Sequence, residues 1–196
     1  MILFFDTETS GLWRNDLAAD DQSQPHLVQL AACLDDGKRK EAASMAMLIK
    51  PSGWIMEAEA HEIHGISETR CHRYGVDLRD ALRLFKTLSL SAETIVAHGI
   101  DFDAMVIQTQ LHKLGVESLW WEKMKRRFFC TKLRGADILK REGQYGGSYQ
   151  WQSLKTCHEE IVGEPFNQTH DAAEDTKALK RVYYAMIDQH GEADGE

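Results

Sequence analysis

The stretch FFDTETSGL, residues 4–12, joins an apolar segment to two acids that stand two residues apart. Residues 1–5 form a short apolar run bounded by turn-forming residues, which predicts a buried strand. Side chains alternate between the two faces of a strand, so Asp6 and Glu8 share a side with Phe4 if the strand continues that far. Both carboxylates would then lie at the edge of a core, where they repel each other and need a compensating positive charge.

The segments that follow predict three antiparallel strands in all. Residues 13–25 are polar and end in Pro25, so we expect a loop there. Beyond it, residues 26–35 and 43–51 have the pattern of further strands. The sequence DDGK at 35–38 supplies a hairpin turn between them, which makes an antiparallel arrangement the simplest outcome.

Helices and a further strand follow in the second part of the chain. Residues 77–90 carry apolar side chains at helical spacing, and residues 94–98 predict a short strand. We expect further helices at 101–114 and 171–189 and another near 151–161. Strands followed by alternating helix and strand predict an α/β fold in which helices pack on a mixed sheet.

Length and composition predict one globular unit. The chain has 196 residues, of which 43% are hydrophobic, so we expect one domain over residues 1–190 and a flexible tail at 191–196. No apolar run approaches the roughly 20 residues needed to cross a bilayer, and the first residues lack the pattern of a signal peptide. We therefore expect a cytoplasmic protein with no membrane partner. The four cysteines lie far apart and are expected to be reduced thiols.

The formal net charge of −8 argues against a protein that holds nucleic acid mainly through a large basic surface. It does not exclude an enzyme that acts on nucleic acid. Acids gathered around divalent cations form a site that is locally positive when the cations are bound, whatever the charge of the whole chain.

Two of the predicted helices each direct an acid toward an apolar face. Asp175 precedes Leu179 by four residues and falls in the same stripe, and Asp103 stands in register with Val106 and Ile107. With Asp6 and Glu8, three separate elements then bring carboxylates toward the core.

An unpaired carboxylate removed from water costs several kcal/mol, and clustering several of them adds mutual repulsion. Two hard divalent cations such as Mg²⁺ or Mn²⁺ suit a set of carboxylate oxygens. Taken singly, each acid has another interpretation: Asp6 could cap a turn, Glu8 could be solvated, and Asp103 or Asp175 could reach water from the margin of its stripe. Taken together, the four acids favour a site for two metal ions.

His170 lies just before the helix expected at 171–189. Asp171 and Glu174 have the spacing of a capping box that opens this helix, so His170 falls outside it, five residues before Asp175. A lone histidine is often structural. Beside a metal site, however, an imidazole can take a proton from water near neutral pH, which makes His170 a candidate general base.

These residues resemble the DEDDh exonucleases, the DnaQ-like proofreading and RNA-trimming family of the ribonuclease H-like superfamily. FFDTETSGL matches the first family motif, VAHGIDFDAMVI (96–107) the second and HDAAEDTKAL (170–179) the third, and EIHGIS (62–67) resembles the segment between the first two. The resemblance spans roughly residues 2–187. It implies a ribonuclease H-like mixed sheet of three antiparallel strands plus parallel strands, flanked by helices.

The resemblance also implies roles for individual residues. Four acids would hold two divalent ions, and His170 would activate the water; the acids are Asp6, Glu8, Asp103 and Asp175. In such sites the ions lie about 3.5–4 Å apart and stabilise the attacking and leaving oxygens at phosphorus. Thr7 would contact the terminal nucleotide through its backbone, and Leu12 and Phe102 would wedge against its base, although an aromatic residue beside a helix start is commonly part of the core.

The chain departs from the family pattern at two positions. The second motif usually reads His-Asn, whereas this chain has His98 followed by Gly99, which removes a side-chain amide. Gln29 stands where the family frequently has an acid, so a secondary contact is expected to differ. Neither change removes a predicted metal ligand.

Three other segments have two interpretations each. His61 and His64 could suggest a metal pair, but their spacing is not that of HExxH and the resemblance makes them part of a turn on the substrate side. The basic run KMKRRFF at 123–129 could contact a phosphate backbone or a stacked base, or form a solvated helix face, which we favour. The Gly/Tyr-rich loop at 143–150, continued by Trp151, could contact single-stranded substrate.

Two functions from different classes fit these features. The first is a metal-dependent 3′–5′ exonuclease that acts on single-stranded DNA or RNA ends and releases nucleoside 5′-monophosphates. The second is a catalytically silent module that binds nucleic-acid ends or a polymerase. The intact set of acids with His170 favours the enzyme, because binding alone does not require carboxylates that repel each other.

Overall fold

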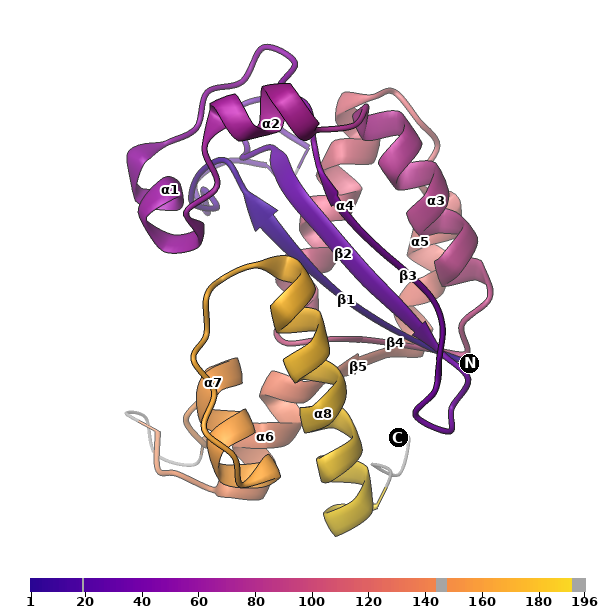
Figure 1. The fold of residues 1–196 in the computed structure, drawn as a ribbon, viewed down its shortest axis with the longest axis vertical. Helices are drawn as coiled ribbons and strands as arrows, with labels where there is room; N and C mark the ends of the chain where they lie inside the picture. The colour runs from indigo at the N-terminus through magenta and orange to yellow at the C-terminus, as the bar shows by residue number, and fades with distance from the viewer. Residues whose placement is uncertain (19, 144–147, 192–196) are drawn as a thin grey trace.

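The computed structural model describes residues 1–18, 20–143 and 148–191 and is built around a five-stranded sheet (Figure 1). Its strands lie in the order β3-β2-β1-β4-β5, with the bounds Ile2–Thr9 (β1), Leu27–Asp35 (β2), Glu41–Leu48 (β3), Thr94–Ala97 (β4) and Phe128–Cys130 (β5). The first three strands are antiparallel neighbours, and β4 and β5 run parallel to β1. The mixed sheet of three antiparallel plus parallel strands is thus confirmed.

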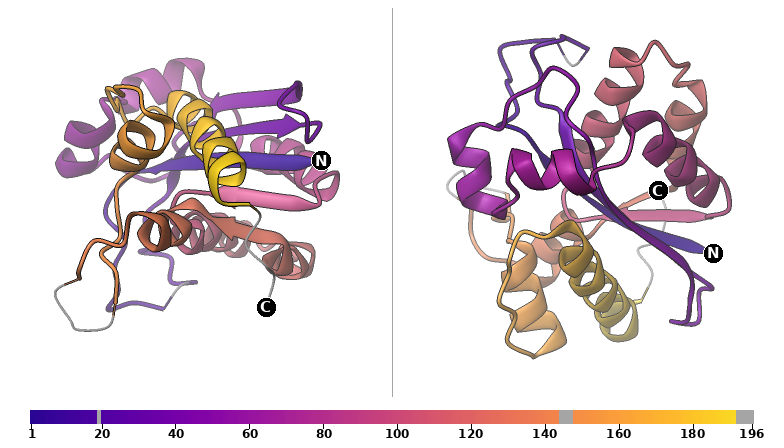
Figure 2. Two further views of the ribbon diagram at one scale, coloured as in Figure 1. Left: turned by 90° about the horizontal axis from the view of Figure 1, so that it is seen from below. Right: turned by 45° about the horizontal axis from the view of Figure 1, so that its top comes forward.

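Helices cover both faces of this sheet (Figures 1 and 2). One face carries α3, α4 and α5, and the other carries α6, α7 and α8. The helices are α1 (Ala58–His64), α2 (Glu68–Tyr74), α3 (Leu78–Leu90), α4 (Ile100–Lys113), α5 (Leu119–Met124), α6 (Thr131–Leu139), α7 (Leu154–Cys157) and α8 (Ala172–His190). A π-helical turn over His158–Val162 extends α7, so the helix expected near 151–161 is divided in two.

Strand β1 continues through the acids and keeps its alternation of faces. Leu3 and Phe5 pack into the core with α3, α4 and α5, whereas Phe4 packs against α8. Pairing with β2 persists beyond residue 5, with Glu8 opposite Gln29. Asp6 and Glu8 therefore lie on the α8 side of the sheet.

Several elements differ from the predicted ones. The first strand ends at Thr9 rather than at residue 5, and β5, α1, α2, α5 and α6 were not predicted. The expected turn at 62–67 is the end of α1, which closes at Gly65 with φ +66° and leads into α2. The basic run at 123–129 is no continuous helix face, because it passes from α5 through a 3-10 turn into β5.

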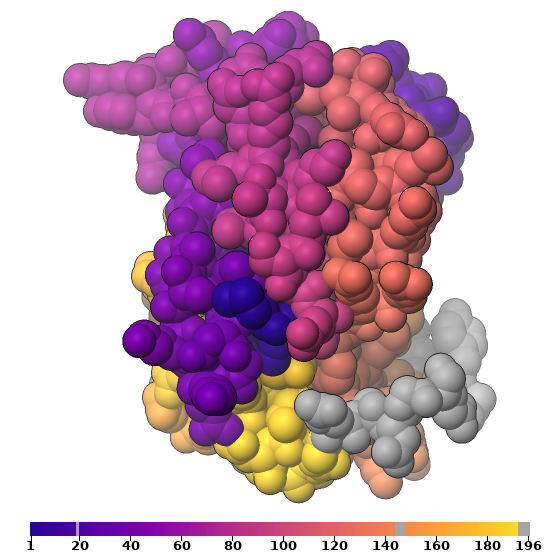
Figure 3. Space-filling model, turned by 90° about the vertical axis from the view of Figure 1, so that its right-hand side faces the viewer, coloured from indigo at the N-terminus to yellow at the C-terminus, as the bar shows by residue number. Residues whose placement is uncertain are grey.

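Helix α8 is fixed to the end of β2 by an ion pair with a buried carboxylate. The Lys180 ammonium lies 2.6 Å from the carboxylate of Asp35, which is fully buried at the end of β2, and the Tyr184 hydroxyl donates to the same carboxylate. The β2–β3 hairpin beyond Asp35 stands at the surface beside the start of β1 and α3 (Figure 3). This attachment sets where the other end of α8 meets β1.

Three remaining expectations concern cysteines, membranes and loops. The four cysteines are free thiols, as expected. Among the described residues, no helix is long and apolar enough to cross a bilayer. Residues 144–147 of the Gly/Tyr-rich loop and 192–196 of the expected tail lie outside the described residues.

Candidate functional site

The four predicted metal ligands meet in one cleft of about 560 Å³. Asp6 and Glu8 come from β1, Asp103 from the first turn of α4 and Asp175 from the first turn of α8. Asp103 and Asp175 are each only 3% exposed. The cleft is lined by Asp6, Thr7, Glu8, His98, Phe102, Asp103, Lys132, Trp151, Gln152, Ser153, Leu154, Gln168, His170 and Asp175.

Thr7 holds Asp103 against β1. Its backbone N–H and its hydroxyl both donate to Asp103 Oδ1, at 3.1 and 2.7 Å. The N–H of Thr7 is thus engaged with a predicted metal ligand, and the backbone contact of Thr7 with the terminal nucleotide stays a prediction. Thr7 therefore positions a carboxylate, a role that residue spacing did not reveal.

Asp175 is oriented by Gln168, a residue that no sequence pattern indicated. Gln168 Nε2 donates to Asp175 Oδ2 at 2.8 Å. The second oxygen, Oδ1, is buried and has no hydrogen-bond partner among the described residues. Ligand atoms of Glu8, His170 and Asp175 all lie within 4.8 Å of one another. A buried carboxylate oxygen without a partner, set among further carboxylates, fits the oxygen-rich ligand set that Mg²⁺ and Mn²⁺ prefer.

The protons of these acids are held more tightly than usual. Burial raises the pKa of Glu8 to about 9, and the charges of Asp175 and Asp103 add to the rise. Burial also raises the pKa of Asp103 to about 7, although the hydrogen bonds from Thr7 act in the opposite direction. Burial is also the main cause of the raised pKa values of Asp6 and Asp175. Without cations, the cleft therefore disfavours full ionisation of its four acids.

His170 lies at the mouth of the site because of how α8 begins. Its backbone has a left-handed φ of +51°, and the next residue, Asp171, caps the helix by accepting hydrogen bonds from Ala173 N and Glu174 N. The predicted capping box is only half formed, because the Glu174 carboxylate pairs with Lys177 at 2.8 Å. His170 is thus outside the helix, as expected, and it lines the cleft beside Asp175.

Gln29 fixes the start of α8 to the sheet. Its Nε2 donates to Asp171 Oδ2 at 3.0 Å, and its Oε1 accepts from Ala172 N at 3.0 Å. Gln29 also pairs with Glu8 across the β1–β2 ladder. The residue that differs from the family pattern therefore ties together the two elements that carry Glu8 and Asp175.

His98 is structural in this arrangement. Its Nε2 donates to the Gln152 carbonyl at 3.0 Å, so Nδ1 accepts from the Thr131 hydroxyl at 3.0 Å. Burial lowers the pKa of His98 to about 4, which keeps the ring neutral. His98 thus holds the segments around residues 131 and 152 at the rim of the cleft.

The two predicted base contacts differ in their position. Phe102 lines the cleft, is 37% exposed and packs edge-to-face against Trp13 with ring centroids 6.3 Å apart. Leu12 is 54% exposed but is not among the lining residues. The contact of both residues with a base stays a prediction.

His61 and His64 do not form a metal pair. His61 Nδ1 contacts the Ile66 carbonyl at 3.0 Å, while His64 accepts from Ile66 N at Nδ1 and donates to the Thr9 carbonyl at Nε2. The contact of His64 with Thr9 joins the end of α1 to the end of β1.

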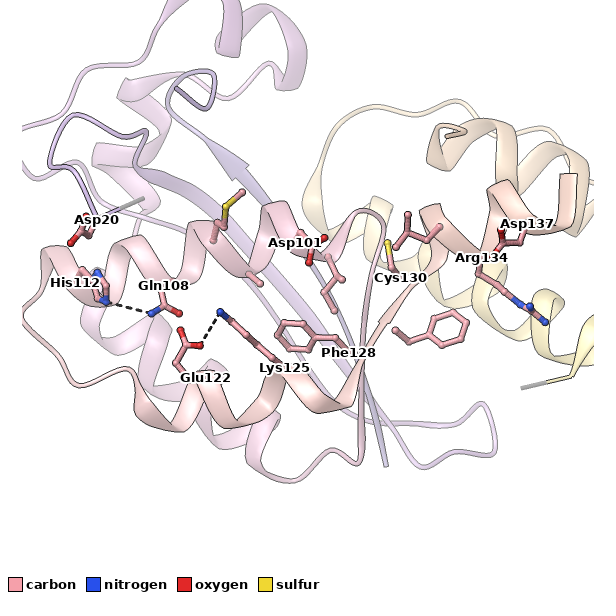
Figure 4. A pocket seen from close by; sticks show the side chains of 15 residues that line it. Asp20, Asp101, Gln108, His112, Glu122, Lys125, Phe128, Cys130, Arg134 and Asp137 are labelled. Atoms are coloured by element: carbon pink, nitrogen blue, oxygen red, sulfur yellow. Dashed lines mark hydrogen bonds and ion pairs between the residues drawn. The ribbon is translucent and has the colours of Figure 1, made fainter. Parts of the chain in front are cut away.

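A larger hollow, of about 900 Å³, lies elsewhere, along α4, α5, β5 and α6 (Figure 4). Aromatic side chains of β5, Phe128 and Phe129, form part of its wall. Charged groups at its rim are partly paired with each other, as Lys125 is with Glu122 at 2.8 Å. The four acids and His170 lie in the smaller cleft, so size does not mark the candidate site.

Several solved structures share this fold. Exonuclease I of E. coli in complex with a dA16 oligonucleotide superposes with a TM-score of 0.72 at 16% identity, covering 96% of this chain and 41% of that chain. A zinc-bound complex of the same E. coli protein with single-stranded DNA gives 0.73 at 16% identity, covering 97% and 41%. Exonuclease X in complex with 5′-overhanging duplex DNA gives 0.62 at 20% identity, covering 98% and 95%.

The chain therefore spans about two fifths of the length of the Exonuclease I chains that it matches. At identities this low, the superpositions establish a common fold and nothing more. Comparison of the sequence with curated proteins gave no significant match. A family model described as Exonuclease, of the RNase T type, matches residues 3–183. Because that match covers nearly the whole of a chain with a ribonuclease H-like fold, this protein belongs to the exonuclease family.

Proposed function

We propose that this chain is a metal-dependent 3′–5′ exonuclease that removes nucleoside 5′-monophosphates from single-stranded DNA or RNA. The observation that carries the proposal is the convergence of four carboxylates from three elements on one cleft, where a buried oxygen of Asp175 has no hydrogen-bond partner in the described part of the chain. The strands bound by Exonuclease I and the overhanging duplex bound by Exonuclease X support a nucleic-acid substrate.

The proposed chemistry is the hydrolysis of the last phosphodiester bond. Asp6, Glu8, Asp103 and Asp175 would hold two divalent ions, Mg²⁺ or Mn²⁺. Bound there, the ions would supply positive charge to the attacking and leaving oxygens. A ring nitrogen of His170 takes the proton of the water whose oxygen attacks phosphorus. The bond from phosphorus to the 3′ oxygen of the preceding nucleotide breaks, and that oxygen takes a proton from solvent.

The surrounding residues keep this constellation in place before substrate arrives. Thr7 restrains Asp103, Gln168 restrains Asp175, and Gln29 holds the helix start that follows His170. Such preorganisation lets the site act without rearranging its ligands during the reaction.

The direct test uses a 5′-labelled oligonucleotide with Mg²⁺ or Mn²⁺. Stepwise shortening from the 3′ end with release of nucleoside 5′-monophosphates is expected. Asp175→Ala should abolish shortening, and His170→Ala should slow it about 10²–10⁴-fold, the usual contribution of a general base. Asp101→Ala, which removes an exposed acid on α4, is the matched control and should leave the rate unchanged.

Binding distinguishes the enzyme from the silent module. Calorimetry with Mn²⁺ should show a weaker affinity in Asp175→Ala and a nearly unchanged affinity in His170→Ala. Binding of the oligonucleotide without shortening in either metal would reject the exonuclease in favour of the module. Matched DNA and RNA oligomers, single-stranded and duplex, at one salt concentration then define the preferred substrate.

A further inference from the structure

One positively charged side chain, that of Lys132, lines the cleft beside the four acids and His170. Among the described residues Lys132 is the single lysine or arginine there, and it forms no ion pair with any of them. It stands in the first turn of α6, and its charge opposes the rise in the pKa of Asp103. An ammonium that lies beside the proposed site of hydrolysis and pairs with no carboxylate of the described residues is available to an anionic ligand.

Trp151 lies next to this ammonium. Lys132 Nζ is 5.0 Å from the centroid of the Trp151 ring, within range of a cation–π contact. The indole lines the cleft and is 63% exposed, unlike Trp121, which is completely buried. A large aromatic face left open beside the catalytic carboxylates offers a surface on which an unpaired base can stack.

Gly99 lies under the stem of the lysine. Its φ of +94° is left-handed, and a Cβ added there would lie 3.4 Å from Lys132 Cδ, an ordinary contact distance. The stem of Lys132 therefore lies over the position where the second motif usually carries an amide. His98, which precedes Gly99, holds the neighbouring Gln152 at the rim.

We propose that Lys132 and Trp151 form a subsite for the nucleotide next to the one being removed, with the indole stacked on its base and the ammonium paired with its phosphate. This subsite rests on the proposed exonuclease function. The nucleotide that is removed would contact the surfaces around Thr7 and Phe102, which line the cleft from β1 and α4. The pair would therefore contribute to holding a strand rather than to the cleavage step.

The test compares a substrate that has a nucleotide before the scissile phosphate with one that has none. One is a 5′-labelled oligothymidylate, and the other is the methyl ester of thymidine 5′-monophosphate, which has no aromatic group in place of the preceding nucleotide. Trp151→Leu should raise KM for the oligonucleotide about tenfold, the loss expected for one stacked base, with kcat nearly unchanged. Hydrolysis of the ester should stay within about twofold of wild type, since the ester has no base for Trp151.

Lys132→Met should also raise KM for the oligonucleotide. In addition, it should reduce the slope of log KM against log salt by about 0.7, the value for one phosphate contact on a single strand. Lys132→Arg should restore that slope. Equal effects of these variants on both substrates, or no effect on the oligonucleotide, would overturn the subsite.

Matched controls come from two similar pairs outside the cleft. Lys86 on α3 lies 5.2 Å from the ring of Trp120 on α5, and Lys86→Met should change neither KM nor the salt slope. Tyr74 is 62% exposed under Arg73, and Tyr74→Leu should likewise behave as wild type. Thermal unfolding verifies that each variant is folded.

A binding titration tests the subsite independently of the proposed reaction. With chelator present, oligothymidylate should quench the tryptophan fluorescence of the wild type, and Trp151→Leu should lose most of this quenching. Equal quenching in both would contradict the subsite. A wild type that quenches but degrades neither substrate would overturn the exonuclease function and leave the subsite supported.

Discussion

Burial of Glu8 in the cleft lowers the stability of the folded protein near neutral pH when no cation is bound. Burial raises its pKa from 4.5 to about 9, so the folded protein keeps the Glu8 proton to a higher pH than the unfolded chain does. The corresponding stability is fully present below the unfolded pKa and is lost as pH rises through the folded pKa. Between about pH 4.5 and 9, Glu8 therefore becomes progressively more destabilising.

Replacing this carboxylate should stabilise the metal-free protein. We expect Glu8→Gln in chelator to raise the thermal midpoint by roughly 2–4 °C at pH 8 and by less at pH 5. Scanning calorimetry at the two pH values is the measurement, with Glu62→Gln, an exposed acid on α1, as the control. A midpoint that falls at pH 8, or that rises equally at both pH values, would contradict the raised pKa of Glu8.

The acids were predictable from the sequence because regular elements carry them. Alternation along a strand places Asp6 and Glu8, and the apolar stripes of two helices place Asp103 and Asp175. Gln168 was not predictable, because it lies in the irregular segment before α8, where no periodicity indicates which side chain turns inward. Lys132 and Trp151 were missed as a pair because only tertiary folding brings α6 beside the loop before α7.

At the scale of elements, the attachment of α8 to β2 can be tested through Gln29. Gln29→Ala removes both hydrogen bonds to the helix start, so we expect a loss of about 1–3 kcal/mol in the free energy of unfolding and a lower kcat. Urea unfolding and oligonucleotide kinetics measure the two effects. Gln22→Ala, in the exposed loop before β2, is the control. An unchanged kcat in a destabilised variant would show that Gln29 supports the fold but not the site.

The elements that the sequence did not reveal are short or contain a glycine. Helices α1 and α2 have seven residues each and α5 has six, too few turns for an apolar stripe to repeat, and β5 has three. Helix α6 contains Gly135, which normally argues against a helix. Here the glycine is required by packing, because a Cβ at Gly135 would lie 2.6 Å from Cys157 Sγ on α7.

At the scale of the whole molecule, cation binding should be coupled to folding. The proposed ion site exists only where β1, α4 and α8 have come together, so divalent ions bound there would stabilise the folded state alone. At 100 times its dissociation constant, Mn²⁺ should raise the thermal midpoint by about 5–10 °C. Asp175→Ala should lose most of this rise and Asp101→Ala should keep it. A rise of the same size in both variants would place the ion elsewhere.

The order of strands and helices was largely predictable because long apolar strands dominate the core. All nine residues of β2 are buried, and β1 joins the antiparallel strands β2 and β3 to the parallel strands β4 and β5 in the expected mixed arrangement. The crossing of α6 and α7 over the rim of the cleft was not predictable, since it depends on His98 reaching Gln152 and Thr131 from the end of β4.

Strand β1 carries phenylalanines for the core and acids for the cleft in a single alternating run. Deleting one residue between Ile2 and Asp6 would turn every later side chain to the opposite face. The carboxylates would then point under α4, and Thr7 would take their place beside α8. This strand can accept substitutions, but it can neither gain nor lose a residue without dismantling the cleft.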